Sequence, residues 1–271
     1  MFLFSTSYGQ DRPIRLVVRG DDMGIAQSVN EACIRSFKEG IMTTVEVMVT
    51  GPWYPEAAKL LQETPGLDVG IHLALTSEWD HVKSRPLTAG RSFVDENGYF
   101  LPMVWPTEGY KELSLMEQEL DMEEVEKELR AQIQQAVNTL PRISHITDHM
   151  GFTSLSKELR SLFEELGKEY GLDIFPAAIG VKKITYHFKP GTERNKEKAF
   201  IEMLESMTPG DYYFLDHPGL DTPELRGFGH RGYENVAEDR ANVTALFLSS
   251  RVKKVVQEKK IQLITYPDFV K

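Results

Sequence analysis

Two adjacent carboxylates, Asp21 and Asp22, stand between glycines in residues 19–24, directly after an apolar run. A carboxylate at the end of a buried strand loses hydration, so it needs a cation or several hydrogen-bond donors in compensation. His72 and His149 lie at or just past the carboxyl ends of other predicted strands. One aspartate and two histidines, with a second aspartate to spare, form the ligand set of an open catalytic metal site. The sequence therefore predicts a metal-dependent hydrolase.

Each of these residues also has an ordinary structural explanation. Asp22 is the predicted carboxylate ligand, and a helix N-cap or an Asx turn is its alternative. Asp21 would lie near the metal without binding it and act as a general base, with the same turn as its alternative. His72 lies among aliphatic residues, where a hydrogen-bonded core histidine is the competing interpretation. His149 is better supported as a ligand, because Asp148 directly precedes it. The two interpretations of Asp148 are a partner that orients the imidazole and a helix cap.

The other histidines differ in what surrounds them. His217 stands in a turn fixed by Pro218. Hydrolysis of an amide needs an acid to protonate the departing nitrogen, and a histidine near neutrality can supply that proton. An ordinary turn residue is the alternative for His217. His81, His187 and His230 have no supporting neighbours, and we expect them at the surface or in loops.

Two further side chains are candidate substrate contacts. Arg240 follows an acidic pair in a predicted helix, and a solvated helix face is the favoured interpretation over a substrate contact. Trp79 belongs to a set of aromatic residues near strand ends and in a long loop. Such rings stack on sugars, although a hydrophobic cover for the loop explains them equally well.

Composition excludes several classes of protein. The 271 residues are 41% hydrophobic and 27% charged, which is typical of a soluble globular protein with a sizeable core. The net charge of −10 argues against a nucleic-acid partner, because phosphate binding needs a basic surface. No apolar run approaches the length of a transmembrane helix, so no membrane partner is expected. The single cysteine, Cys33, excludes an intramolecular disulfide, and its helical spacing predicts a buried position.

The first ten residues resemble the end of a secretory signal, with a short apolar piece followed by small residues. They have no basic region, and the apolar part is short for a working signal. A periplasmic or secreted protein is expected if residues 1–10 are a truncated export signal, and a cytoplasmic protein is expected otherwise.

Strand-like and helix-like segments alternate along the chain. The predicted strands cover residues 14–18, 43–49, 67–75, 143–147, 173–175, 211–215 and 261–266, and a strand and loop lie within 179–190. The predicted helices cover residues 28–39, 54–63, 115–140 with a break near Asp121, 155–170, 193–207 and 236–259. Serial units of this kind imply a parallel barrel or a doubly wound sheet, with functional groups at the carboxyl ends of the strands.

Four motifs together resemble the YdjC/ChbG-like carbohydrate deacetylase family. They are Gly-Asp-Asp-Met-Gly at 20–24, Gly-Ile-His-Leu-Ala-Leu-Thr at 70–76, Ser-His-Ile-Thr-Asp-His-Met-Gly at 144–151 and Asp-His-Pro-Gly at 216–219. Their order and spacing agree with the family over residues 14–266. The resemblance implies an α/β fold, a single-domain TIM-like (β/α) barrel that is irregular, with seven or eight strands. A tail at residues 1–13 would precede this domain at residues 14–271, which would include a loop excursion at 76–115.

The resemblance also implies an activity, the removal of N-acetyl groups from amino sugars or chitooligosaccharides. Asp22, His72 and His149 would hold a divalent metal, with Asp21 as the base and His217 as the acid. Zn²⁺ or Mg²⁺ is the expected ion, and Mn²⁺, Co²⁺ or Ni²⁺ are alternatives. The expected partner is an N-acetylated sugar.

The sequence departs from the family pattern at three places and leaves rival functions open. Arg19 stands where the family commonly has Asn, Gly20 often stands as Ala, and residues 147–148 read Thr-Asp where Asp-Ser or Asp-Thr is usual. The rivals are a metal hydrolase of another amide or ester and a non-catalytic sugar-binding barrel. The acidic helix at residues 115–140 indicates a solvated face, with a homodimer contact as its alternative.

Overall fold

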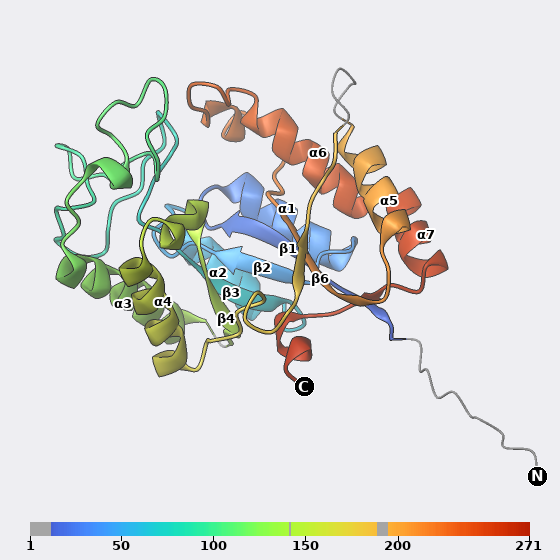
Figure 1. The fold of residues 1–271 in the computed structure, drawn as a ribbon. Helices are drawn as coiled ribbons and strands as arrows, with labels where there is room; N and C mark the ends of the chain where they lie inside the picture. The colour runs from blue at the N-terminus through green and yellow to red at the C-terminus, as the bar shows by residue number, and fades with distance from the viewer. Residues whose placement is uncertain (1–11, 141, 189–194) are drawn as a thin grey trace, which may run out of the picture.

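The computed structural model describes residues 12–140, 142–188 and 195–271, which form an α/β fold of alternating strands and helices (Figure 1). Its strands are β1 (Ile14–Met23), β2 (Thr44–Val47), β3 (Asp68–Leu73), β4 (His145–Asp148), β5 (Lys182–Ile184), β6 (Gly210–Asp216) and β7 (Gln262–Leu263). Its α-helices are α1 (Gln27–Lys38), α2 (Tyr54–Gln62), α3 (Met122–Thr139), α4 (Lys157–Tyr170), α5 (Lys196–Ser206), α6 (Val236–Leu248) and α7 (Ser250–Glu258). Short 3₁₀ helices are η1 (Leu115–Glu117), η2 (His149–Ser154), η3 (Leu225–Gly227) and η4 (Tyr266–Phe269).

The strands form one parallel sheet in the order β4-β3-β2-β1-β6-β5, and β7 also pairs with β1. β7 lies beside the beginning of β1, opposite Arg15 and Leu16, whereas β2 pairs with its second half. Within the described ranges no ladder joins β4 to β5, so the sheet is an open half-barrel. The prediction of parallel strands connected by helices is confirmed, but the closed TIM-like barrel is not formed by these ladders.

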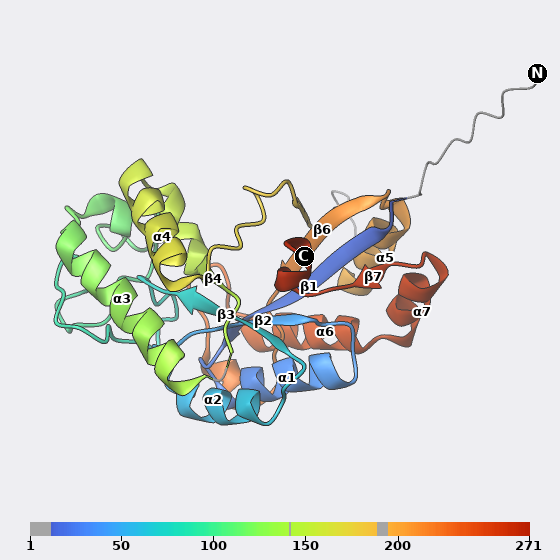
Figure 2. The same ribbon diagram turned by 90° about the horizontal axis from the view of Figure 1, so that it is seen from below.

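The helices surround the outside of this half-barrel. Figure 2 shows α1, α2 and α6 along one side of the sheet, with α3 and α4 at the β4 end and α5 and α7 at the β6 end. β1 lies in the middle of the sheet, and its apolar residues Leu16, Val17 and Val18 are fully buried. A strand covered on both faces is typically a continuous apolar run, as observed here.

β1 continues past its predicted end because its second half pairs with strands on both sides. Gly20 lies opposite Val45 of β2 and Asp216 of β6. The register with β2 shifts between Gly20 and Met23, and Asp22 has a φ of 70°. A β-bulge redirects side chains at the end of a strand, and aspartate tolerates a positive φ better than most residues. The irregularity therefore orients the acidic pair at the carboxyl edge of the sheet.

Two predicted helices are divided by capping residues. The break expected near Asp121 is confirmed, because the Asp121 carboxylate accepts hydrogen bonds from Glu123 N and Glu124 N at the start of α3. The single helix predicted over residues 236–259 is wrong, since α6 ends at Leu248 and α7 begins at Ser250. The Ser249 hydroxyl accepts from the first backbone amides of α7, and a serine cap of this kind starts a new helix.

The strand predicted at residues 173–175 is also wrong. Ile146 N donates to Leu172 O, as it would to a neighbouring strand, but Phe175 N then bonds back to Asp173 O. This turn and the following Pro176 stop a ladder from forming. The strand in this part of the chain is β5, within the expected strand and loop of residues 179–190.

The long excursion at residues 76–115 has no α-helix or strand, as predicted, but it is tied to the core. Glu128 of α3 is fully buried and accepts hydrogen bonds from Leu87 N, Thr88 N and Thr88 Oγ1. Phe93 and Phe100 are also fully buried. The excursion is therefore a packed part of the fold.

Some predictions fall outside the described residues. These are the signal-like segment at residues 1–10 and the beginning of the helix predicted at 193–207. In the described part of the chain, no helix combines the length and apolar character needed to cross a membrane.

Candidate metal centre

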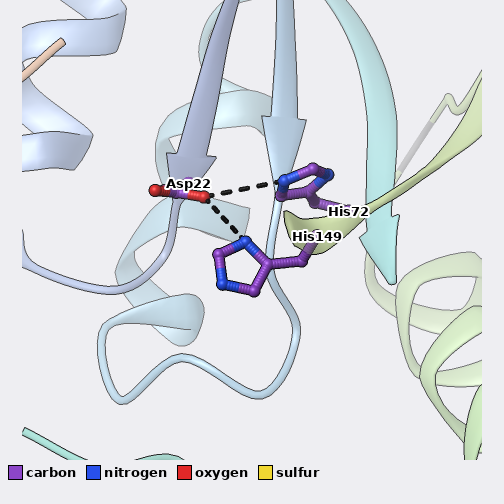
Figure 3. Close-up of side chains that lie close together, drawn as sticks. All are labelled: Asp22, His72 and His149. Atoms are coloured by element: carbon purple, nitrogen blue, oxygen red, sulfur yellow. Dashed lines mark ion pairs between the residues drawn. The ribbon is translucent and has the colours of Figure 1, made fainter. Parts of the chain in front are cut away.

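Asp22, His72 and His149 meet at the carboxyl ends of β1, β3 and β4 (Figure 3). Asp22 Oδ1 lies 3.6 Å from His72 Nε2 and 3.4 Å from His149 Nδ1. The two rings meet nearly edge to face, at an interplanar angle of 78°. All three side chains are buried, and their potential ligand atoms lie within 4.8 Å of one another. The structure thus brings the three predicted ligands together.

The outer nitrogen of each imidazole has its own partner. His72 Nδ1 lies 2.8 Å from Thr147 Oγ1, and His149 Nε2 lies 2.9 Å from Glu78 Oε2. These contacts hold the ring nitrogens that point away from Asp22. The other nitrogen of each ring, His72 Nε2 and His149 Nδ1, faces Asp22. Contacts of this kind orient the histidines of metal sites and fix their tautomers.

The donor set fits a divalent metal. Among the described residues Asp22 Oδ1 has no hydrogen-bond partner, although it is buried. A buried carboxylate oxygen without a donor costs free energy, which a cation would offset. Carboxylate oxygen and imidazole nitrogen are ligands for zinc and similar ions, and three protein ligands leave a position for water or substrate.

The other oxygen of Asp22 is held by Arg240 of α6. Arg240 Nη2 donates to Asp22 Oδ2 at 2.6 Å, and the two side chains are only 2% and 1% exposed. The guanidinium also lies over the ring of Trp79, 5.4 Å from its centroid. The favoured prediction of a solvated face for Arg240 is wrong, because α6 directs this residue toward the strand ends.

Asp21 lies beside the three-residue cluster. Arg19 Nε and Nη2 donate to its two carboxylate oxygens at 2.7 Å each. Asp21 Oδ2 is 3.9 Å from His72 Nε2. Arg19 Nη1 donates to the hydroxyl of Tyr266 at 3.2 Å, which fixes the guanidinium in turn. The departure from the family pattern at Arg19 therefore supplies the group that orients Asp21.

His217 lies near the opposite oxygen of Asp22. Its Nε2 is 3.9 Å from Asp22 Oδ2, its Nδ1 is 3.5 Å from Asp216 Oδ1, and its side chain is 38% exposed. Asp216 is itself fixed by the Tyr186 hydroxyl, which donates to it at 2.8 Å. Partial burial lowers the pKa of His217, but Asp22 and Asp216 outweigh this effect and raise it above its ordinary value.

Burial and neighbouring charges also shift the pKa values of Asp22, His149 and His72. Burial raises the pKa of Asp22, but Arg240 opposes it so strongly that the carboxyl has a pKa well below its ordinary value. Burial also lowers the pKa of His149, whereas Glu78 and Asp22 together raise it to about 10. The pKa of His72 is lowered, mainly by burial. Asp22 is therefore anionic at neutral pH, as a carboxylate ligand of a metal must be.

A cavity of about 600 Å³ ends at this cluster. Its walls include Trp79, His230 and Tyr233, with ring centroids 5.8 Å apart for Trp79 and His230 and 6.0 Å apart for Trp79 and Tyr233. A cavity of this size accommodates a small ligand.

His230 was expected at the surface or in a loop. It lies in the loop before α6, but it lines the cavity. His81 and His187 lie in loops, as predicted.

Asp22 and Asp148 each had a helix cap as an alternative interpretation. The N-cap residue of α1 is Ala26, with no side-chain hydrogen bond, so the N-cap alternative for Asp22 is wrong. Asp148 Oδ2 accepts hydrogen bonds from Thr153 N at 3.0 Å and Thr153 Oγ1 at 2.7 Å. The Asp148 carboxylate thus bonds to Thr153 within η2 without capping its first turn, while Glu78 is the carboxylate that contacts His149.

Two acidic residues near the cluster were not predicted. Glu46 of β2 is fully buried. Its place between the apolar residues Val45 and Val47 is unusual for a glutamate and could have indicated a functional role. Glu78 lies in the irregular excursion, where neither spacing nor flanking residues distinguish it. The position of Glu78 depends on how this loop packs against η2.

The fold and the cluster define a parallel α/β half-barrel protein with an Asp-His-His group suited to a divalent metal. A family model described as YdjC-like protein matches residues 15–258, so this chain belongs to the YdjC-like family. The resemblance predicted from the four motifs is therefore confirmed.

Two relatives agree with this assignment, and one solved structure has a similar fold. The chain is 26% identical over 267 residues to "Carbohydrate deacetylase 2" of Listeria innocua, covering 95% of this chain and 100% of the relative. It is 30% identical over 232 residues to "Carbohydrate deacetylase" of Thermus thermophilus, covering 78% of this chain and 80% of the relative. A crystal structure from Enterococcus faecalis, described as a proposed cellobiose-phosphate cleavage protein, has a TM-score of 0.74 at 21% identity, covering 94% and 98% of the two chains. This structural similarity supports the fold alone.

Proposed function

We propose that this chain is a metal-dependent carbohydrate deacetylase that removes N-acetyl groups from amino sugars or chitooligosaccharides. The observation that carries the proposal is the buried cluster of Asp22, His72 and His149 at the end of an open cavity. The names of the relatives from Listeria innocua and Thermus thermophilus support the reaction class. The proposal treats residues 14–271 as one catalytic domain.

Asp22 Oδ1, His72 Nε2 and His149 Nδ1 would hold the divalent metal, with Zn²⁺ or Mg²⁺ as the first candidates and Mn²⁺, Co²⁺ and Ni²⁺ as alternatives. A bound divalent ion supplies Lewis-acid polarisation of an acetyl carbonyl and makes a water molecule more acidic. Burial of all three side chains supports this role, because a dry site strengthens electrostatic effects.

Asp21 is the proposed general base. Both of its oxygens contact Arg19, which orients the carboxylate beside the cluster and stabilises its charge. Asp21 Oδ2 lies near His72 Nε2 without belonging to the three-residue group. From this position the carboxylate can take a proton from water that attacks the acetyl carbon.

His217 is the proposed general acid. Asp216 and Asp22 favour its protonated form, and its side chain is partly open to the cavity. A protonated imidazole at this place can give its proton to the amine nitrogen as the carbon–nitrogen bond breaks. In this proposal the base comes from β1 and the acid from the residue after β6.

Trp79 and Arg240 are the proposed substrate contacts, since both border the cavity. Trp79 belongs to an aromatic wall with His230 and Tyr233. Sugar rings pack their apolar faces on aromatic side chains of this kind.

The test is acetate release from a panel of N-acetylated mono- and oligosaccharides. The protein is stripped of metal and reloaded separately with Zn²⁺, Mg²⁺, Mn²⁺, Co²⁺ or Ni²⁺. We expect metal-dependent release that His72→Ala abolishes and that His81→Ala, a loop variant outside the cavity, retains. If no acetate appears with metal bound, the deacetylase proposal fails. Turnover of another acyl substrate or sugar binding without turnover would then identify the rival function.

A further inference from the structure

We infer that Glu46 is a positioning residue that acts through the Thr147 hydroxyl to keep the His72 proton on Nδ1. His72 Nε2 then presents its lone pair to Asp22. The inference rests on the proposed function in one respect, since it takes His72 as a metal ligand. Glu46 itself contacts neither the reacting atoms nor the metal position.

The sheet register places Glu46 under the cluster. In the ladders of β2, β3 and β4, Glu46 lies opposite Gly70, and Gly70 lies opposite His145. Because Gly70 has no side chain, Glu46 and His145 reach each other across β3, and a Cβ at Gly70 would collide with both. Thr147 lies opposite His72 two residues further along these strands, on the same face.

Glu46 is fully buried, and its contacts are short. His145 Nε2 lies 2.6 Å from Glu46 Oε1, and the Thr147 hydroxyl donates to Glu46 Oε2 at 2.6 Å. Burial raises the pKa of Glu46, but His145 and Arg19 lower it to about 2. The carboxylate is therefore ionised, and both of its oxygens can only accept hydrogen bonds.

These contacts determine the direction of the next hydrogen bond. Thr147 has a single hydroxyl proton, which it gives to Glu46. At 2.8 Å from His72 Nδ1, the Thr147 oxygen can then only accept, so His72 carries its proton on Nδ1. Nε2 is left without a proton 3.6 Å from Asp22 Oδ1 and 3.9 Å from Asp21 Oδ2. His72 Nε2 and Asp22 Oδ1 then face each other as two electron-pair donors, which favours a cation between them.

Glu46 also lies close to the group that orients Asp21. Arg19 Nε is 3.8 Å from Glu46 Oε1 and 2.7 Å from Asp21 Oδ1. The buried carboxylate of Glu46 thus neighbours both Thr147, which contacts the predicted ligand His72, and Arg19, which orients the predicted base Asp21.

The first test is the tautomer of His72 in the metal-free protein at neutral pH. Long-range ¹H–¹⁵N NMR correlation on ¹⁵N-histidine-labelled protein distinguishes the protonated ring nitrogen from the bare one, and His72→Gln assigns the signals. We expect Nδ1 protonated and Nε2 bare in the wild type. In Thr147→Val the Nε2-protonated form should become populated, while Thr147→Ser should keep the wild-type pattern.

The second test is the Zn²⁺ affinity of the same proteins by isothermal titration calorimetry. Loss of a partner that orients a ligating histidine typically weakens metal binding about 10–100-fold, which we expect for Thr147→Val. Glu46→Gln should have a similar effect, because its amide can donate to Thr147 and let that hydroxyl donate to His72 Nδ1. Thr147→Ser should bind Zn²⁺ with the wild-type affinity. Valine matches threonine in volume, and thermal unfolding checks that each variant is folded.

The outcomes separate this inference from the proposed function. A proton on His72 Nε2 in the wild type, or unchanged Zn²⁺ affinity in folded Thr147→Val, overturns the role of Glu46 even if the protein releases acetate. The expected tautomer and affinity changes support that role even if no N-acetylated sugar is hydrolysed. In that case only the deacetylase proposal fails.

Discussion

Asp22 and Arg240 are 218 positions apart in the sequence, yet Asp22 Oδ2 and Arg240 Nη2 form a buried ion pair of 2.6 Å. The guanidinium offsets the desolvation of the carboxylate and occupies one of its oxygens. The other oxygen is thereby left to face His72 and His149. This pair connects α6 to the end of β1 and fixes the carboxylate of the predicted metal centre.

Removal of Arg240 should destabilise the metal-free protein. Arg240→Met leaves Asp22 buried without its main counter-charge, and breaking a buried pair in this way typically costs about 3–5 kcal/mol. Urea unfolding measures the loss. In the double variant Asp22→Asn with Arg240→Met both charges are absent, so most of the stability should return. A loss below about 1 kcal/mol in the single variant would show that the pair contributes little.

Asp21→Asn should lower the rate of acetate release about 10²–10⁴-fold, because an amide cannot accept the proton of the attacking water. The affinity for the metal should stay as in the wild type, since Asp21 is outside the ligand group. Steady-state kinetics and calorimetric metal titration measure the two effects separately. Retained metal with an unchanged rate would rule out Asp21 as the base.

His217→Asn should separate substrates by their leaving groups. Departure of a sugar amine needs a proton, so amide hydrolysis should fall about 10²–10⁴-fold. Departure of 4-nitrophenolate needs none, so hydrolysis of 4-nitrophenyl acetate should change little. The ratio of the two rates is the measurement. An equal fall for both substrates would mean that His217 does not act as the acid.

The sequence was sufficient to predict that the three proposed ligands meet at one edge of the sheet. Asp22, His72 and His149 each lie at or just past the end of a predicted strand, and a parallel sheet brings these ends together. The resemblance to the family strengthened this prediction, and the structure places the three side chains in one cluster.

Contacts between distant segments could not be predicted in this way. Arg240 has the local sequence of an exposed helix residue, and only the packing of α6 against the strand ends buries it. Glu78 depends on the path of an irregular loop. The open sheet follows from the turn at Asp173, where a predicted strand does not form. Local patterns therefore identified the three clustered side chains but missed most of the groups that orient them.

The C-terminal 3₁₀ helix should make stability depend on acid pH. Hydrogen bonds from Lys271 and from Thr265 hold the pKa of Asp268 at about 2. Since this pKa is below the unfolded value of about 3.9, the carboxylate stabilises the fold above about pH 4. That contribution is lost as the pH falls through about 2.

Asp268→Asn removes this titration and provides the comparison. The difference in unfolding free energy between wild type and variant should be present at about pH 6 and should shrink between about pH 4 and pH 2. Urea unfolding across this range measures it. A difference that stays constant with pH would contradict the assigned role of Asp268.

The most direct test of the metal-dependent deacetylase is a titration of the stripped protein with its best metal while acetate release is recorded. The account predicts no release without metal, then a rate that rises in proportion to added metal until each chain holds a single ion. Asp22→Asn should remain inactive throughout the titration. Acetate release that persists after the metal is removed, or that does not respond to its return, would contradict the account.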